Sequence, residues 1–192
     1  MNRIDQIITR TGDNGTTALA DGTRHLKSSP RFMTMGDVDE LNSHIGLLRS
    51  HLRIDENTDN DSKINELDHF LTDIQHHLFE IGSELAVPGM SFLNSKALDM
   101  LETWSAKETA NLPALKEFIL PSGTIGASQA HVCRSVARRA ERSMVDLAQV
   151  EAVNDLLVRY LNRCSDVFFI MARVLNQYAQ HPETHWRGNL NE

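Results

Sequence analysis

Residues 62–86 read S-K-I-N-E-L-D-H-F-L-T-D-I-Q-H-H-L-F-E-I-G-S-E-L-A and have the clearest hydrophobic period in the chain. Their apolar side chains recur at alternating steps of three and four, which is typical of a seam in a helical bundle. These side chains are Ile64, Leu67, Leu71, Ile74, Leu78, Ile81 and Leu85. Because Val87-Pro88-Gly89 ends the pattern, we predict a helix over 62–86 that buries one long apolar stripe.

Similar spacing on both sides of this segment predicts four more helices. They lie at about 31–52, 94–110, 123–150 and 154–179. Ser29 and Pro30 suit the start of the first, with Ser as N-cap and Pro at the first helical position. The last has a wide apolar face, which indicates a central position.

The rest of the chain has no helical period. It consists of an N-terminal arm (1–28), a polar loop (53–61) and an irregular tail (180–192). Since no repeat or linker is visible, we predict an all-α fold in a single domain over residues 1–192. It would be a five-helix bundle (29–179) with an irregular N-terminal arm.

Composition limits the function classes. The chain has 192 residues, with 41% hydrophobic and 6% aromatic, which suits a helical protein. A net charge of −7 argues against nucleic acid as the main partner. The N-terminus is too polar for a signal peptide, and no apolar run approaches the roughly 18 residues of a membrane helix. We therefore expect no membrane partner, a cytoplasmic location, and free buried thiols at Cys133 and Cys164.

Residues 118–142 concentrate positive charge in this acidic chain. They read F-I-L-P-S-G-T-I-G-A-S-Q-A-H-V-C-R-S-V-A-R-R-A-E-R, with four arginines and one glutamate in the second half. Since one carboxylate cannot neutralise four guanidinium groups, the cluster needs another acidic surface or a polyanion such as a triphosphate. The plainer alternative is a solvated basic face. An apolar stripe on another side of the same helix can face a core, and consists of Cys133, Ala137, Ala140, Met144 and Leu147.

The arm contains a second candidate anion site. Its residues 9–17 read T-R-T-G-D-N-G-T-T. Gly12 and Gly15 allow a turn that directs backbone N–H groups at an anion, although a hairpin or plain surface turn is the alternative. Together with Lys27 and the arginine helix, this turn forms an anion-binding set that would act by charge clamping and positioning.

Other chemistry is less well supported by the residues. Glu66 and His69 form one E-x-x-H on a helix, whereas di-metal carboxylate bundles use two plus further glutamates. The polar row around them points away from the apolar seam, so a solvated or subunit-facing stripe is favoured and no metal site is predicted. His131 could be a core-edge residue or a ligand. Among the carboxylates of helix 31–52, one could meet the arginine cluster.

Six motifs, in order and at matching spacing from residue 9 to about 175, resemble those of PduO-type ATP:cob(I)alamin adenosyltransferases. They are T-R-T-G-D-N-G-T-T, Lys27, G-D-V-D-E-L-N-S (36–43), F-I-L-P-S-G, R-S-V-A-R-R-A-E-R and Y-L-N-R (160–163). The resemblance implies a homotrimer with active sites between subunits. It also implies transfer of the adenosyl group of ATP to cobalt, giving adenosylcobalamin and tripolyphosphate.

The resemblance further implies the substrates and the chemistry. ATP would bind with Mg²⁺, and cob(II)alamin would be reduced to cob(I)alamin by a reductase. Because cob(I)alamin is itself a strong nucleophile, the attack on the ribose C5′ needs no protein base. The arginines, Lys27 and Mg²⁺ would stabilise the leaving tripolyphosphate.

The site residues implied by motif position fall into three groups. The nucleotide site would comprise Thr9, Arg10, Thr11, Gly12, Thr17, Ala18 and Lys27 of the arm with Arg138, Arg139, Glu141, Arg142 and Asn162. Arg138 and Phe118 would be catalytic, with Phe118 crowding the lower face of the corrin ring and displacing its lower ligand. Asp39 and Arg134 would form a salt bridge across the subunit interface.

Two features depart from the family pattern. Ser122 stands where many members have a second glycine. The tail from His181 matches no family pattern, so the residue that closes the cobalamin pocket is not assigned, and Trp186 is a candidate. The alternative functions are a trimeric nucleotide sensor of the same fold that has lost transfer, and a di-metal bundle.

Overall fold

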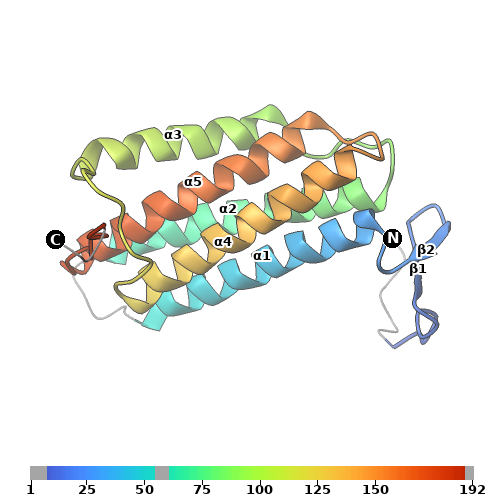
Figure 1. The fold of residues 1–192 in the computed structure, drawn as a ribbon, viewed down its shortest axis with the longest axis horizontal. Coiled ribbons are helices and arrows are strands. Elements are labelled where there is room, and N and C mark those ends of the chain that lie inside the picture. The colour runs from blue at the N-terminus through green and yellow to red at the C-terminus, as the bar shows by residue number, and fades with distance from the viewer. Residues whose placement is uncertain (1–7, 55–60, 189–192) are drawn as a thin grey trace.

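A computed structural model describes residues 8–54 and 61–188 of the chain (Figure 1). Within these residues it contains five helices and one two-stranded sheet. The helices are α1 (Pro30–Ile54), α2 (Asp61–Ala86), α3 (Ser95–Asn111), α4 (Ile125–Ala148) and α5 (Asp155–Tyr178), and the strands are β1 (Thr16–Ala18) and β2 (Arg24–Leu26). The predicted five-helix class is confirmed. Part of the predicted loop 53–61 lies outside the described residues.

Each predicted helix is present, with ends at most two residues from the expected positions. Side-chain caps explain several starts: Asn94, Thr124 and Asn154 each accept a hydrogen bond from a backbone N–H in the first turn of α3, α4 and α5. The start of α1 differs from the prediction in one respect. Pro30 is its first residue as expected, but the Ser29 hydroxyl is buried and finds no hydrogen-bond partner among the described residues, so it does not cap the helix.

The arm is not wholly irregular, which corrects the prediction. Strands β1 and β2 pair antiparallel, with Thr17 opposite His25, around a turn at Gly22. Each strand has three residues, and most of them are exposed. Because so short and solvated a hairpin needs no alternation of apolar residues, it leaves no period in the sequence. The arm is anchored where the Ala20 N–H donates to the Ala86 carbonyl at the end of α2 (3.0 Å).

The predicted apolar stripes form the core. Helix α4 packs between α1 and α5 and runs opposite to both, while α2 packs against α1 and α3 against α5 (Figure 1). The stripe on α4 is completely buried. Both cysteines are buried free thiols, and burial raises the pKa of Cys133 to about 12, so it stays protonated. No helix in the described part of the chain has both the length and the apolar character needed to cross a membrane.

The two ends of the bundle carry different appendages (Figure 1). The arm hairpin lies at the end where α1 and α5 begin and α2 and α4 finish. The segment between α3 and α4 and the C-terminal tail lie together at the opposite end. Since α4 has 24 residues, the two ends are about 36 Å apart along its axis.

Candidate functional site

The arm gathers its predicted ligands around a tight turn. The Gly15 N–H donates to the Gly12 carbonyl (3.2 Å), and the Lys27 N–H donates to the Gly15 carbonyl (3.0 Å). A Cβ on Gly12 would lie 3.0 Å from the Lys27 ammonium nitrogen, so the absence of a side chain at Gly12 lets this ammonium group approach the turn. The turn thus holds a cation beside the backbone of Gly12, which is one component of an anion site.

Arg24 holds this turn together, a role that the sequence did not reveal. Its Nη2 donates to the Thr11 carbonyl (2.7 Å), and its Nε donates to the Thr16 hydroxyl (3.1 Å). The Thr9 and Thr11 hydroxyls lie 3.0 Å apart. Arg10 between them has φ +57°, a backbone conformation that non-glycine residues adopt infrequently. The remaining predicted arm residues, Thr17 and Ala18, belong to β1.

The four arginines of α4 have different environments. The Arg139 Nε donates to Asp37 of α1 (3.0 Å), and its Nη2 donates to Glu40 of the same helix. Part of the acidic surface that these arginines need is therefore supplied by α1 of the same chain. The sequence left open that one carboxylate of this helix could meet the arginine cluster. Arg138 and Arg142 are exposed, and neither forms an ion pair within the part of the chain that the structure describes. Their charges face solvent.

A polar pair from two helices lies beside these exposed arginines. Glu141 follows Arg138 by one turn, and its carboxylate accepts a hydrogen bond from the Asn162 amide of α5 (2.8 Å). The pair is exposed enough to meet a ligand and joins α4 to α5. Arg138, Glu141 and Arg142 of α4 therefore lie near one another, and the Asn162 amide joins them from α5. Arg139 faces α1 instead.

The proposed interface pair does not form within one chain. Asp39 is exposed, and no ion pair among the described residues joins it to Arg134. Arg134 is half-buried, its Nε has no hydrogen-bond partner in the described chain, and burial together with nearby Arg138 lowers its pKa. Within the described residues, the buried Nε of Arg134 is therefore left without an acceptor.

Phe118 lies in the segment between α3 and α4, and its side chain is 78% exposed. The tail pairs with this segment. Ile119 and His185 form an antiparallel bridge, the Trp186 N–H donates to the Phe118 carbonyl (2.7 Å), and the Leu120 N–H donates to the Thr184 carbonyl (2.8 Å). Because side chains alternate along paired strands, Phe118 and Trp186 lie on the same face.

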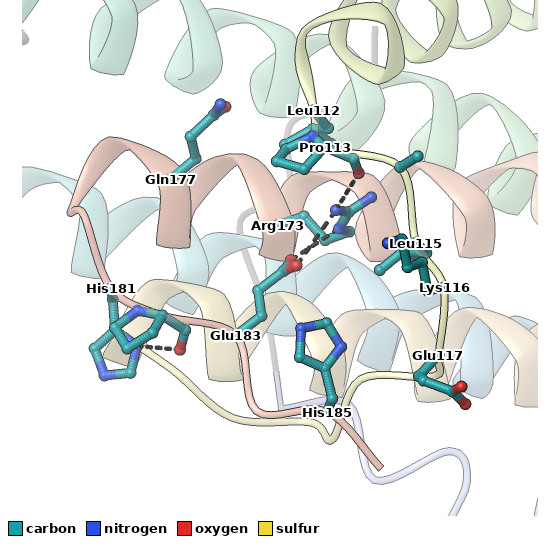
Figure 2. A pocket seen from close by; sticks show the side chains of 12 residues that line it. Leu112, Pro113, Leu115, Lys116, Glu117, Arg173, Gln177, His181, Glu183 and His185 are labelled. Carbon is teal, nitrogen blue, oxygen red and sulfur yellow. Dashed lines mark hydrogen bonds and ion pairs between the residues drawn. The ribbon is translucent and has the colours of Figure 1, made fainter. Parts of the chain in front are cut away.

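Arg173 of α5, missed by the sequence reasoning, lies between Pro113 and Glu183 (Figure 2). Its guanidinium binds Glu183 of the tail through Nε (2.8 Å) and the Pro113 carbonyl through Nη2 (2.8 Å). These groups border a cavity of about 620 Å³ between the α3–α4 segment and the tail. A charged residue inside the apolar face of α5 is the signal that could have found it, since buried charges need partners.

The remaining sequence candidates lie elsewhere. His131 is buried against Phe169, with ring centroids 6.2 Å apart; both ring nitrogens lack partners in the described chain, and burial lowers its pKa. The polar row of α2 faces outward as predicted, with Glu66 and His69 exposed. Within the described ranges, no three His, Cys, Asp or Glu residues form a group that could hold a metal.

Comparisons with known proteins bear on the family and the fold. Residues 7–175 match the family model for cobalamin adenosyltransferase. A cobalamin adenosyltransferase from Cupriavidus metallidurans is 47% identical over 97% of this chain and 96% of its own, and a corrinoid adenosyltransferase from Bacillus subtilis is 41% identical over 89% and 86%. A solved variant of a PduO-type ATP:corrinoid adenosyltransferase from Lactobacillus reuteri, complexed with cobalamin and ATP, superposes with a TM-score of 0.85 at 35% identity, covering 95% of this chain and all of that one.

Proposed function

The chain belongs to the cobalamin adenosyltransferase family, and we propose that it transfers the 5′-deoxyadenosyl group of ATP to the cobalt of cob(I)alamin. The products are adenosylcobalamin and tripolyphosphate. The electron pair of cobalt(I) forms the bond to C5′ while the bond from C5′ to the triphosphate oxygen breaks. The observation that carries the proposal is the exposed, unneutralised pair Arg138 and Arg142 beside an Arg139 that α1 already neutralises.

The phosphates of ATP have two sets of ligands. On the arm, Lys27 offers an ammonium group beside the turn at Gly12. On α4, Arg138 and Arg142 offer guanidinium groups, which stabilise the charge that develops on the leaving tripolyphosphate. The nucleotide site comprises Thr9, Arg10, Thr11, Gly12, Thr17, Ala18, Lys27, Arg138, Arg139, Glu141, Arg142 and Asn162.

Arg139 and Glu141 shape this site as well as facing it. Arg139 ties α4 to the acidic side of α1, which fixes the direction in which Arg138 and Arg142 project. Glu141 supplies a carboxylate oxygen, a hard ligand that suits a Mg²⁺ ion bound mainly by the phosphates of ATP, while the Asn162 amide nitrogen holds that carboxylate. Mg²⁺ would neutralise phosphate charge and leave the arginines to orient the chain of phosphates.

Phe118 serves the corrinoid. Its exposed ring at the end of the bundle offers an apolar wedge against the lower face of the corrin, where it displaces the lower ligand of cobalt. Losing that ligand raises the cobalt(II)/cobalt(I) potential, so a reductase can then supply the electron. Trp186, on the same face of the paired segments, closes the other side of this apolar surface.

The enzyme acts as a homotrimer with sites between subunits. The arm and Phe118 lie at opposite ends of one chain, so a site that uses both takes them from two copies (Figure 1). A groove of about 420 Å³ between α1 and α2 contains Asp39 and Phe79, and the Phe79 ring is 68% exposed. Apolar side chains at Val132 and Val145 are exposed on α4. Two different apolar surfaces suit a head-to-tail contact that closes into a ring, with Asp39 pairing to Arg134 across it.

The proposal also includes a single domain and a location in the cytoplasm. Residues 1–192 act as one adenosyltransferase domain, which agrees with a family match over 7–175. The enzyme works in the cytoplasm, where buried thiols such as Cys133 and Cys164 stay reduced.

The test is formation of the cobalt–carbon bond by purified protein. Protein, MgATP and chemically reduced cob(I)alamin are mixed without oxygen, and adenosylcobalamin is followed by its light-sensitive absorbance. Tripolyphosphate should appear in equal amount. If ATP binds but no adenosylcobalamin forms with excess cob(I)alamin, the chain is the nucleotide sensor instead.

A further inference from the structure

The ion pair between Arg173 and Glu183 is a largely buried link between the bundle and the tail. The Arg173 side chain is 7% exposed and that of Glu183 is 18% exposed. Both guanidinium donors on that side are used, with Nε to Oε1 at 2.8 Å and Nη2 to Oε2 at 3.3 Å. A bidentate pair with so little solvent fixes both side chains, and removing one partner strands the other charge.

The same guanidinium also holds the segment that carries Phe118. Arg173 Nη2 donates to the Pro113 carbonyl, five residues before Phe118, while Glu183 leads directly into the residues that pair with Phe118 and Leu120 (Figure 2). One side chain of α5 therefore connects the start of the Phe118 segment to the tail that covers it.

The other end of the segment is held by Asn176, one turn further along α5. Its amide oxygen accepts from the Thr124 N–H (3.0 Å), its amide nitrogen donates to the Ser122 carbonyl (3.3 Å), and its own carbonyl accepts from the His181 N–H (2.8 Å). Gly123 has φ +122°, and a Cβ there would lie 2.1 Å from the Asn176 amide oxygen. Two buried polar residues of α5 thus fix both ends of the segment and both ends of the tail turn.

Between these fixed points the Phe118 ring itself has little support. Its side chain is largely exposed, and its backbone is held by the hydrogen bond from Trp186. The position of the ring is therefore set by the backbone pairing with the tail, and that pairing depends on the anchor at Glu183.

We propose that Arg173 and Glu183 are positioning residues for the corrinoid step: their buried ion pair fixes the tail against the 113–124 segment and so holds Phe118 where it can displace the lower ligand of cobalt. This inference rests on the proposed function and on the role proposed there for Phe118. It gives the tail a role with the corrinoid and no role with ATP. In the described chain, the arm and the α4 arginines, which are proposed to bind ATP, make no contact with this ion pair.

The experiment compares Glu183→Gln with Glu151→Gln in the full-length protein. Glu151 is the matched control, since it also binds a buried arginine, Arg31, but at the arm end of the bundle. Each variant is assayed with cob(II)alamin and with cob(II)inamide, a corrinoid that lacks the lower nucleotide ligand and needs no displacement, and a reductant supplies the electron that forms cobalt(I). ATP affinity is measured by calorimetry. Electron paramagnetic resonance of cob(II)alamin bound with ATP reports whether the lower nitrogen ligand is still on the cobalt.

We expect Glu183→Gln to lower cobalamin turnover by about 10-fold, because a small displacement of a reacting group is costly, while cobinamide turnover and ATP affinity stay unchanged. The resonance spectrum should show the lower ligand retained on more of the cobalt, and Glu151→Gln should behave as the unmodified protein in every assay. Arg173→Lys, which keeps the charge but loses the fork that binds Glu183 and Pro113 together, should give the same pattern if Glu183→Gln folds poorly.

Three results would overturn the inference: equal cobalamin turnover in the Glu183 and Glu151 variants, equal losses with both corrinoids, or a parallel loss of ATP affinity. Failure of the unmodified protein to make a cobalt–carbon bond with either corrinoid is a different outcome. It would refute the proposed function itself, whereas the resonance spectrum needs binding alone and still tests the tail.

Discussion

The two ends of this bundle are built in different ways. At the arm end, a short exposed hairpin places a lysine beside Gly12, and the Ala20 N–H joins the arm to the Ala86 carbonyl of the bundle. At the tail end, buried polar groups of α5 hold two irregular segments against each other and leave the Phe118 ring exposed. The arm end suits a flexible polyanion such as the triphosphate of ATP, and the tail end suits a rigid apolar ring such as the corrin. The arginines of α4 lie on the helix that connects them.

The largest effect is expected between the two ends, at Arg138. Arg138→Ala should lower turnover by about 10²–10³-fold with either corrinoid, because it removes a charge that stabilises the leaving tripolyphosphate. Turnover is measured under saturating ATP and cob(I)alamin. Arg159→Ala, an exposed arginine on α5, is the control and should be neutral. Near-normal turnover of Arg138→Ala would contradict the assignment of the α4 arginines to the nucleotide site.

A smaller effect, confined to one substrate, is expected at the tail end. In assays that start from cob(II)alamin and a reductant, Phe118→Ala should slow adenosylation by about 10–100-fold and spare both ATP affinity and cobinamide, since the ring acts on the lower ligand alone. Phe92→Ala, another exposed phenylalanine, serves as control. Equal damage to ATP binding would mean that the two ends do not divide the substrates as proposed.

The arm should show the opposite selectivity. Lys27→Ala removes one charge-assisted phosphate contact and should raise the KM for ATP by about 10-fold, with no change in the KM for the corrinoid. The comparison is with Lys96→Ala, an exposed lysine at the start of α3. A change in corrinoid KM alone would contradict the assignment of the arm to the nucleotide.

The smallest effect concerns stability at the tail end. Gly123→Ala should lower the free energy of unfolding by about 1–3 kcal/mol, because φ +122° strains a side chain and the new Cβ meets the Asn176 amide. Thermal unfolding measures it, with Gly188→Ala, whose surroundings are open, as control for positive φ alone. An unchanged melting temperature would show that the segment moves freely away from α5.

The sequence predicted the bundle well because helical stripes are local. The steps of three and four in α2 and the small residues of α4 follow from neighbours within one helix, and every one of the five helices is present. Asn94 and Thr124, which cap their helices, are equally local signals.

What the sequence did not predict depends on contacts between distant residues. The hairpin of the arm has strands too short and too exposed to show alternation. The partners of Arg139 lie about a hundred residues earlier in the chain, on α1, and those of Arg173 lie in two irregular segments. The grouping of site residues came from the resemblance to a family. Its assignments stay predictions until ligands are bound.

The central claim is that the arm of one copy and the α4 arginines of another bind the same triphosphate. Lys27→Ala and Arg138→Ala variants, with different affinity tags, are co-expressed, and assemblies that carry both tags are isolated and assayed at an ATP concentration well below the KM, where sites with the altered arm are also impaired. Shared sites predict recovery of about one third of the unmodified activity, since in a mixed ring one interface joins an intact arm to an intact arginine helix. If mixed assemblies are as inactive as each variant alone, each chain builds its own site and the account is contradicted.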